Sequence, residues 1–222
     1  MFDVAGDAGD GRIDFHGDLS GVHWIGAHMT EGVVHVHGNA GRHVGSEMRG
    51  GLIHVDGDAS DWVGGEMHGG LIHVCGRAGH LIGAAYRGSR RGMTGGTILI
   101  DGDAGNEIGH TMRRGWIAIG GRSGDLAGFN MLAGSIFLFG ATGIRHGAGM
   151  RRGTIGLFAG AVPKLLPTFR HACRYRPPIL ALMFRHLDQH GFPLDNALRA
   201  AEYDLYHGDF VDQARGEILL RL

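Results

Sequence analysis

The chain has 222 residues, 43 of them glycine and only 5 proline, a composition that excludes collagen and Pro/Gly-rich disorder. Its 21 Lys and Arg nearly balance its 22 Asp and Glu, which argues against a nucleic-acid binder with a broad basic surface. Two cysteines exclude a disulfide framework, a four-cysteine zinc site and a cysteine-ligated iron–sulfur cluster.

The N-terminus lacks the features of a secretory signal, and no apolar run is long enough to span a membrane. We therefore expect a cytoplasmic protein. Residues 3–10 resemble the frayed end of a coil, and a glycine-rich repeat follows over residues 11–158. Most repeat units begin 19 residues after the previous one, and they open at Gly11, Gly32, Gly51, Gly70, Gly96, Gly115, Gly134 and Gly153.

Two aliphatic columns run through this repeat. The third position of the units is Ile or Val throughout, as in Ile53, Ile72 and Ile98, and the fifth is mostly Val, Ile or Leu. Residues two apart lie on the same face of a strand, and β-branched side chains favour strands. Later in each unit a methionine recurs, as in Met48 and Met67.

Such columns are typical of a stacked solenoid, because glycine at this frequency would destabilise helices by about 1 kcal/mol per site. We predict an all-β fold, a right-handed single-stranded parallel β-helix of about eight coils with a short α-helical C-terminal tail. The β-helix domain is expected at residues 1–160 and the C-terminal extension at residues 161–222.

An outward-facing histidine column lies on three consecutive coils, at His35, His54 and His73. Histidine ligates zinc, so a metal or proton site is one interpretation. A flat ladder is expected to hold its imidazoles parallel, so we prefer a stacked polar stripe without metal. Asp56 and Asp101 share another column two coils apart, which does not match the clustered carboxylates of polysaccharide-cleaving solenoids.

The unit that begins at Gly70 is longer than the others, and its extra residues form a glycine-rich loop with three arginines. Arginine suits carboxylates or phosphates, so the loop is a candidate anion-binding site, a contact for an acidic partner surface, or a solvated loop. The candidate contact residues are Tyr86, Arg87, Ser89, Arg90 and Arg91.

Large apolar side chains occupy outward strand positions of the later coils, namely Leu99, Trp116, Phe137, Phe139 and Phe158. Grouped exposed aromatics mark a contact surface rather than a substrate pocket. Either the C-terminal helices or another subunit is expected to cover this apolar patch.

The repeat stops after Gly160, and residues 161–167 are expected to form a linker. Helical periodicity predicts a helix over residues 178–190 and a second over residues 194–205. Residues 216–220 are short and apolar, as in a strand or a docked tail. The segment is expected to cover the last coil, because an open solenoid end exposes unpaired backbone.

The sequence Gly-Ala-Ala-Tyr-Arg-Gly-Ser-Arg-Arg-Gly-Met-Thr-Gly-Gly at residues 83–96, together with the repeated Gly-Asp-Ala-Gly, resembles the C subunit of formylmethanofuran dehydrogenase. It is more similar to the C subunit of the formyltransferase/hydrolase complex, and the tail motifs Leu-Pro-Thr-Phe, Gly-Asp-Phe and Gly-Glu-Ile-Leu agree. The repeat also resembles, more distantly, the C-terminal β-helix of the glutamate synthase large subunit.

The resemblance implies a scaffold subunit without catalytic residues or cofactors of its own. Its partners would be formyltransferase and amidohydrolase-like chains, which move a formyl group between tetrahydromethanopterin and a methanofuran-type carrier and release formate at a metal centre. The arginine-rich loop would face sister subunits or the acidic tail of the carrier.

Two alternatives remain open. In the dehydrogenase, a molybdenum or tungsten subunit related to molybdopterin enzymes would be the partner. A stand-alone metal- or anion-binding solenoid that uses His35, His54 and His73 is the other.

Overall fold

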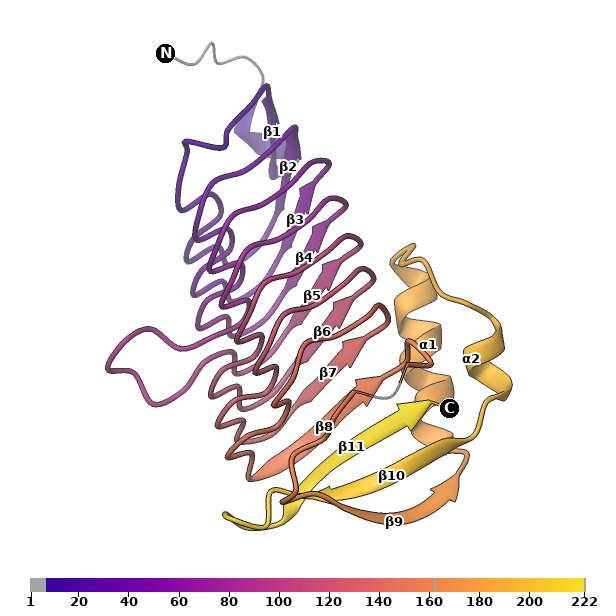
Figure 1. Cartoon of the computed structure of the whole chain (residues 1–222). Coiled ribbons are helices and arrows are strands. Elements are labelled where there is room, and N and C mark those ends of the chain that lie inside the picture. Colours follow the sequence, from indigo (N-terminus) through magenta and orange to yellow (C-terminus); the bar gives the residue numbers. More distant parts are fainter. Residues whose placement is uncertain (1–6, 162, 222) are drawn as a thin grey trace.

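Each repeat forms one short strand, and the strands stack in parallel along a solenoid (Figure 1). The structure is a computed structural model and describes residues 7–161 and 163–221. The predicted all-β solenoid is confirmed. Its strands are β1 (Arg12–His16), β2 (Val33–His37), β3 (Leu52–Val55), β4 (Leu71–Val74), β5 (Thr97–Ile100), β6 (Trp116–Ile119), β7 (Ser135–Leu138) and β8 (Arg152–Leu157).

The coils lie in register, so equivalent side chains stack on one another. Ile53 pairs with Ile72, and Ile72 with Ile98, in neighbouring strands. All three side chains are fully buried. Burial of one such side chain stabilises the fold by about 1.5–3 kcal/mol, so the repeated column contributes at every coil.

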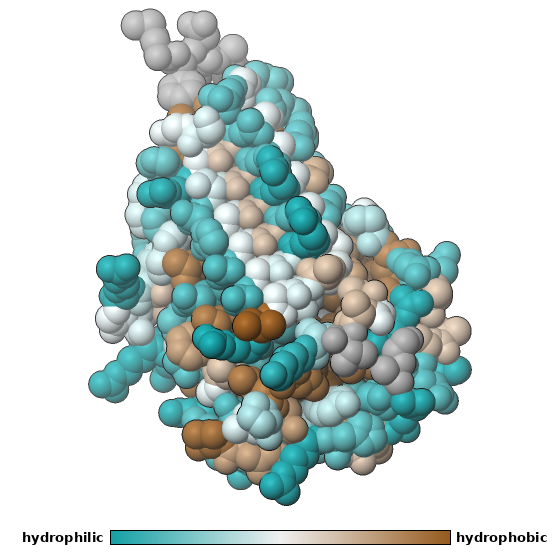
Figure 2. All heavy atoms as spheres, viewed as in Figure 1, coloured by the Kyte–Doolittle hydropathy of each residue, from teal (hydrophilic) through white to brown (hydrophobic). Residues whose placement is uncertain are grey.

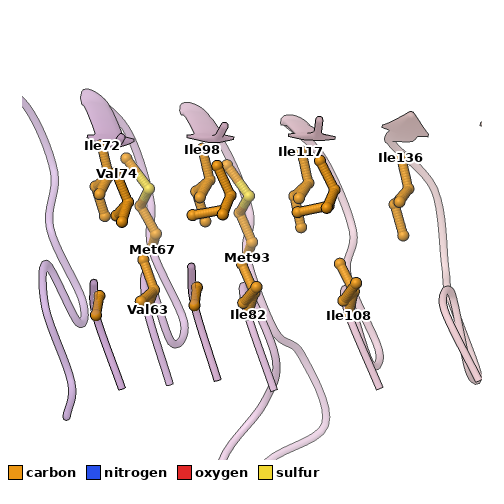
Figure 3. Close-up of a cluster of buried hydrophobic side chains, with 14 of the residues drawn as sticks. Val63, Met67, Ile72, Val74, Ile82, Met93, Ile98, Ile108, Ile117 and Ile136 are labelled. Atoms are coloured by element: carbon orange, nitrogen blue, oxygen red, sulfur yellow. The ribbon is translucent and has the colours of Figure 1, made fainter. Parts of the chain in front are cut away.

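The opposite wall of the solenoid completes the interior. Figure 3 shows the isoleucines of successive strands facing a second aliphatic row, with Met67 and Met93 between the two rows. The second row includes Val63, Ile82 and Ile108, and each of these side chains is fully buried. The methionine column of the repeat lies inside the solenoid, where Met67 and Met93 are fully buried.

The C-terminal segment extends the solenoid sheet instead of forming a separate unit. Strand β11 (Arg215–Arg221) pairs in parallel with β8. Strand β10 (Tyr203–Gly208) then pairs antiparallel with β11, and β9 (Arg170–Tyr175) antiparallel with β10. The last coil is therefore covered by backbone pairing, as expected, although three strands rather than helices provide it.

Helix α1 (Pro178–Gln189) confirms the helix predicted over residues 178–190. It begins with proline at its first position, where the missing N–H is not needed, and Gly191 follows its end. Leu180, Met183 and Phe184 are buried, so one face of the helix packs against the protein. Figure 1 shows α1 beside the later coils of the solenoid.

The second predicted helix, over residues 194–205, is largely wrong. Only α2 (Ala197–Ala200) is helical, and β10 begins at Tyr203. Tyr203 is buried and its hydroxyl donates a hydrogen bond to the carbonyl oxygen of Leu198 at 2.6 Å. Pairing with β9 and β11 overrides the local helical pattern, because it satisfies backbone groups and buries apolar side chains together.

The two ends of the expected coil region are only partly described. Of residues 3–10, Ala8–Asp10 form a short 3-10 helix, η1, and residues 3–6 lie outside the described part of the chain. In the expected linker, residue 162 also lies outside it. Across residues 7–161 and 163–221, neither helix has both the length and the apolar character needed to cross a bilayer.

Candidate functional site

The arginine-rich loop projects from the solenoid between β4 and β5 (Figure 1). Arg87, Ser89, Arg90 and Arg91 are exposed, whereas Tyr86 at the base of the loop is half-buried. Within the described residues, none of the three guanidinium groups forms an ion pair. The loop therefore offers three uncompensated positive charges to whatever contacts it.

An aromatic cluster anchors the base of this loop. Tyr86 lies 5.2 Å from Trp62 and 5.8 Å from His43, measured between ring centroids. His43 stacks on Trp24 at 4.0 Å with nearly parallel planes. The Tyr86 backbone N–H donates to Glu66 Oε1 at 2.9 Å, and burial raises the pKa of the Tyr86 hydroxyl. The base of the loop is thus held against the solenoid, whereas the arginine side chains at its tip are exposed.

The sequence interpretation missed this aromatic cluster of Trp24, His43, Trp62 and Tyr86. The first three residues occupy the same position in consecutive repeats, directly before a core aliphatic residue. The 19-residue spacing could have identified them as a stack. What spacing cannot provide is the position of Tyr86, because the loop that carries it interrupts the repeat.

The apolar patch is covered by this chain's own C-terminal segment, which was one of the two expected alternatives. Leu99, Phe137 and Phe158 are buried, and Trp116 and Phe139 are partly buried. The patch is therefore interior and is not open to a sister subunit at these buried positions. The covering residues are Leu180, Met183, Phe184, Leu187, Phe192, Leu198, Tyr203 and Leu205.

Ring contacts link the apolar patch to α1 and the segment after it. Phe158 lies 5.9 Å from Phe184, and Phe139 lies 5.3 Å from Phe192, between ring centroids. Such aromatic pairs add about 0.5–1.5 kcal/mol to the burial of their surface. In the view of Figure 2, hydrophobic residues gather toward the C-terminal part of the molecule, while hydrophilic residues predominate along the early coils.

The histidine column is in register, but its rings are not parallel. His35 pairs with His54, and His54 with His73, in neighbouring strands. Their ring planes meet at 88° and 87°. The expected parallel ladder is therefore wrong, because hydrogen-bonding groups on adjacent positions turn individual rings. His73 Nε2, for example, lies 2.9 Å from Asp101 Oδ1.

Asp56 contacts two histidines of the column, His35 and His54, and also the adjacent His37. His35 Nε2 lies 2.7 Å from Asp56 Oδ1, and His37 Nδ1 lies 3.0 Å from Asp56 Oδ2. Hydrogen bonding to His35 is the main cause that lowers the pKa of Asp56. Burial, reinforced by the neighbouring His73 and His35, lowers the pKa of His54. The surface thus places imidazoles beside a carboxylate, and these are side-chain types that can ligate a cation.

No protein-family model matches the chain, and a search of curated proteins finds no match. A search of solved structures finds a chain in the crystal structure of the formyltransferase/hydrolase complex (FhcABCD) from Methylorubrum extorquens in complex with methylofuran. The match has a TM-score of 0.88 and 31% sequence identity, and it covers 100% of this chain and 82% of that chain. The similarity therefore includes both the solenoid and the C-terminal segment.

Proposed function

Because the chain belongs to the family of the formyltransferase/hydrolase complex subunits, we propose that it is the scaffold subunit of such a complex and carries no catalytic residue itself. The full-length match to a chain of that complex carries this proposal. The complex would act in tetrahydromethanopterin- and methanofuran-linked oxidation of formaldehyde to formate. Formyltransferase and amidohydrolase-like partners would perform the chemistry with their own metal centre and the carrier.

The solenoid suits a scaffold on physical grounds. Its strands form a continuous parallel ladder, and its interior is filled with tightly stacked aliphatic side chains. Close-packed interiors have low compressibility, so surfaces on different coils keep a defined separation. The hydrolytic complex is preferred to the molybdenum or tungsten dehydrogenase, since the similar chain belongs to a formyltransferase/hydrolase complex.

The arginine-rich loop is the contact we assign to this role. Its three guanidinium groups are exposed and lack ion-pair partners within the described chain, while Tyr86 holds its base against Trp62. Guanidinium groups bind carboxylates in a fork geometry. The loop would accordingly contact an acidic surface of a sister subunit or the acidic tail of a methanofuran-type carrier.

The test replaces Arg87, Arg90 and Arg91 together with Ala in the chain co-produced with its sister subunits. Loss of exposed charge pairs worth roughly 0.5 kcal/mol each should weaken assembly, or raise the KM for the carrier, by about tenfold. Assembly is measured by native mass spectrometry and turnover by formate release. A change in KM with intact assembly would place the contact on the carrier rather than on a subunit.

A matched control removes three exposed arginines that already have partners in this chain. Arg42, Arg77 and Arg122 lie near Asp61, Asp58 and Asp103 and carry the same total charge. Their replacement with Ala should leave assembly and KM within twofold of the wild type. Wild-type assembly and turnover in the loop variant would show that the loop has no such role. Failure of the chain to assemble with any formyltransferase or amidohydrolase-like subunit would contradict the scaffold proposal.

A further inference from the structure

Asp56 lies just after β3, on the outer face of the early coils, and three imidazoles converge on its carboxylate. His35 Nε2 and His54 Nε2 both approach the same oxygen, Oδ1, at 2.7 and 3.2 Å. His37 Nδ1 approaches the other oxygen, Oδ2, at 3.0 Å. The Nε2 atoms of His35 and His54 and the Oδ1 atom of Asp56 therefore lie close together, and all three are atoms of the kind that bind metal ions.

We propose that His35, His54 and Asp56 bind a divalent transition-metal ion, with zinc as the best fit. One ligand atom from each residue lies within 4.8 Å of the other two, which is close enough for one ion after small side-chain rotations. Two imidazoles and a carboxylate are a ligand set that zinc prefers, and three protein ligands leave a fourth position open. This site is independent of the arginine-rich loop and of the proposed scaffold role.

The crossed rings are the observation that permits this site. Parallel imidazoles at the strand spacing would aim their nitrogens in one direction and could not share an ion. The His35 and His54 rings instead meet at 88° with centroids 4.8 Å apart. Their backbones are held by parallel pairing of β2 with β3, so the separation of the two ligands is set by the sheet.

A second layer of contacts orients the central carboxylate. His37 bridges Asp56 and Asp14, because its Nε2 lies 3.1 Å from Asp14 Oδ1. Arg12 in turn donates two hydrogen bonds to Asp14, at 2.6 and 2.7 Å. Metal ligands are commonly supported by outer partners of this kind, and their loss weakens metal binding about 10–100-fold.

The site is also open to an ion from solution. The side chains of His35, His54 and Asp56 are 21%, 30% and 44% exposed. A neighbouring group, His73 with Cys75 and Asp101, lies one coil along and also brings three ligand-type atoms together. Its His73 side chain is only 10% exposed, so the set centred on Asp56 is the more open of the two to an ion from solution.

The experiment titrates the metal-stripped full-length chain with Zn²⁺ by calorimetry and with Co²⁺ by visible absorption. We expect saturable binding of one ion per chain and the intense absorption of four-coordinate cobalt. His54→Ala and Asp56→Asn should abolish both signals. His37→Gln, which changes only the outer layer, should weaken binding about tenfold.

Two control variants separate this site from others. His28→Gln alters an exposed histidine that pairs with Glu47 on another part of the surface, and Asp101→Asn alters the neighbouring group. Both should bind Zn²⁺ as the wild type does. Zinc should also raise the melting temperature of the wild type but not of Asp56→Asn, because a ligand stabilises only the state that binds it.

Three results would overturn the proposal. They are the absence of saturable Zn²⁺ and Co²⁺ binding by the wild type, unchanged binding in both His54→Ala and Asp56→Asn, and loss of binding in Asp101→Asn with retention in Asp56→Asn. Circular dichroism of each metal-free variant checks that its fold is intact. None of these measurements depends on assembly with sister subunits.

Discussion

At the scale of single residues, the corners of the coils leave little room for an extra atom inside the solenoid. Gly64 has φ of +62°, and a Cβ at this position would overlap Cδ1 of Ile98. The Gly64→Ala variant should lose about 3 kcal/mol of unfolding free energy, from the left-handed backbone and from overpacking. Urea denaturation followed by circular dichroism measures this loss.

Gly88 is the matched control because it shares the backbone conformation without the crowding. Its φ is +88°, and nothing lies within 4 Å of the Cβ that alanine would add. Gly88→Ala should therefore cost only about 1 kcal/mol. If the two variants are equally stable, backbone conformation alone determines the role of these glycines and the stacked isoleucines do not crowd the corner.

Residue columns could be predicted from spacing, but side-chain directions could not. The 19-residue period correctly placed His35, His54 and His73 side by side, since it fixes which residues face outward and on which coil. The orientation of each imidazole ring depends on Asp56 and Asp101, which follow the strands of the neighbouring coils. The repeat period determines which backbone positions lie side by side. The convergence of the imidazoles on Asp56 depends instead on hydrogen bonds between side chains of neighbouring coils.

At the scale of secondary-structure elements, α1 stabilises the later coils through one face only. Phe184 is 1% exposed and packs against Phe158, whereas Leu182 on the same helix is 59% exposed. Phe184→Ala should reduce the unfolding free energy by about 3–5 kcal/mol, because it leaves a cavity in the apolar patch. Thermal and urea denaturation provide the measurement.

Leu182→Ala serves as the control for that change. It alters the same helix by a similar loss of side chain, but at an exposed position where the cost should stay below about 0.5 kcal/mol. Similar destabilisation by both variants would mean that helix propensity, and not packing on the solenoid, explains the effect of Phe184. The two variants would then give no support for the role of α1 in covering the apolar patch.

The elements of the C-terminal segment were only partly predictable. Helix α1 has an apolar stripe and a proline start, both of which are local features, and it was predicted correctly. Strand β10 was expected to continue a helix, because residues 194–205 have helical apolar spacing. Strand β10 instead pairs with β9, which is distant in sequence, and with β11, which follows after a turn. No local sequence pattern identifies either partner.

At the scale of the whole molecule, the two ends of the solenoid differ. At one end β11 pairs with β8 and continues both the sheet and the aliphatic stack, since Ile218 pairs with Ile155 and is fully buried. At the other end, Ile13 and Trp24 remain 55% and 48% exposed within the described residues. The C-terminal segment is thus a structural cap that the early coils do not have among the described residues.

This asymmetry predicts the consequence of removing residues 161–222. A chain that ends at Gly160 would leave β8 without its partner β11 and would expose Leu99, Phe137 and Phe158. An unpaired strand edge beside an exposed apolar patch favours association between chains. The truncated chain should therefore form large aggregates under conditions in which the full chain does not, as measured by size-exclusion chromatography with light scattering. A monodisperse truncated chain with the strand content of the intact solenoid would contradict the role of the segment as a cap.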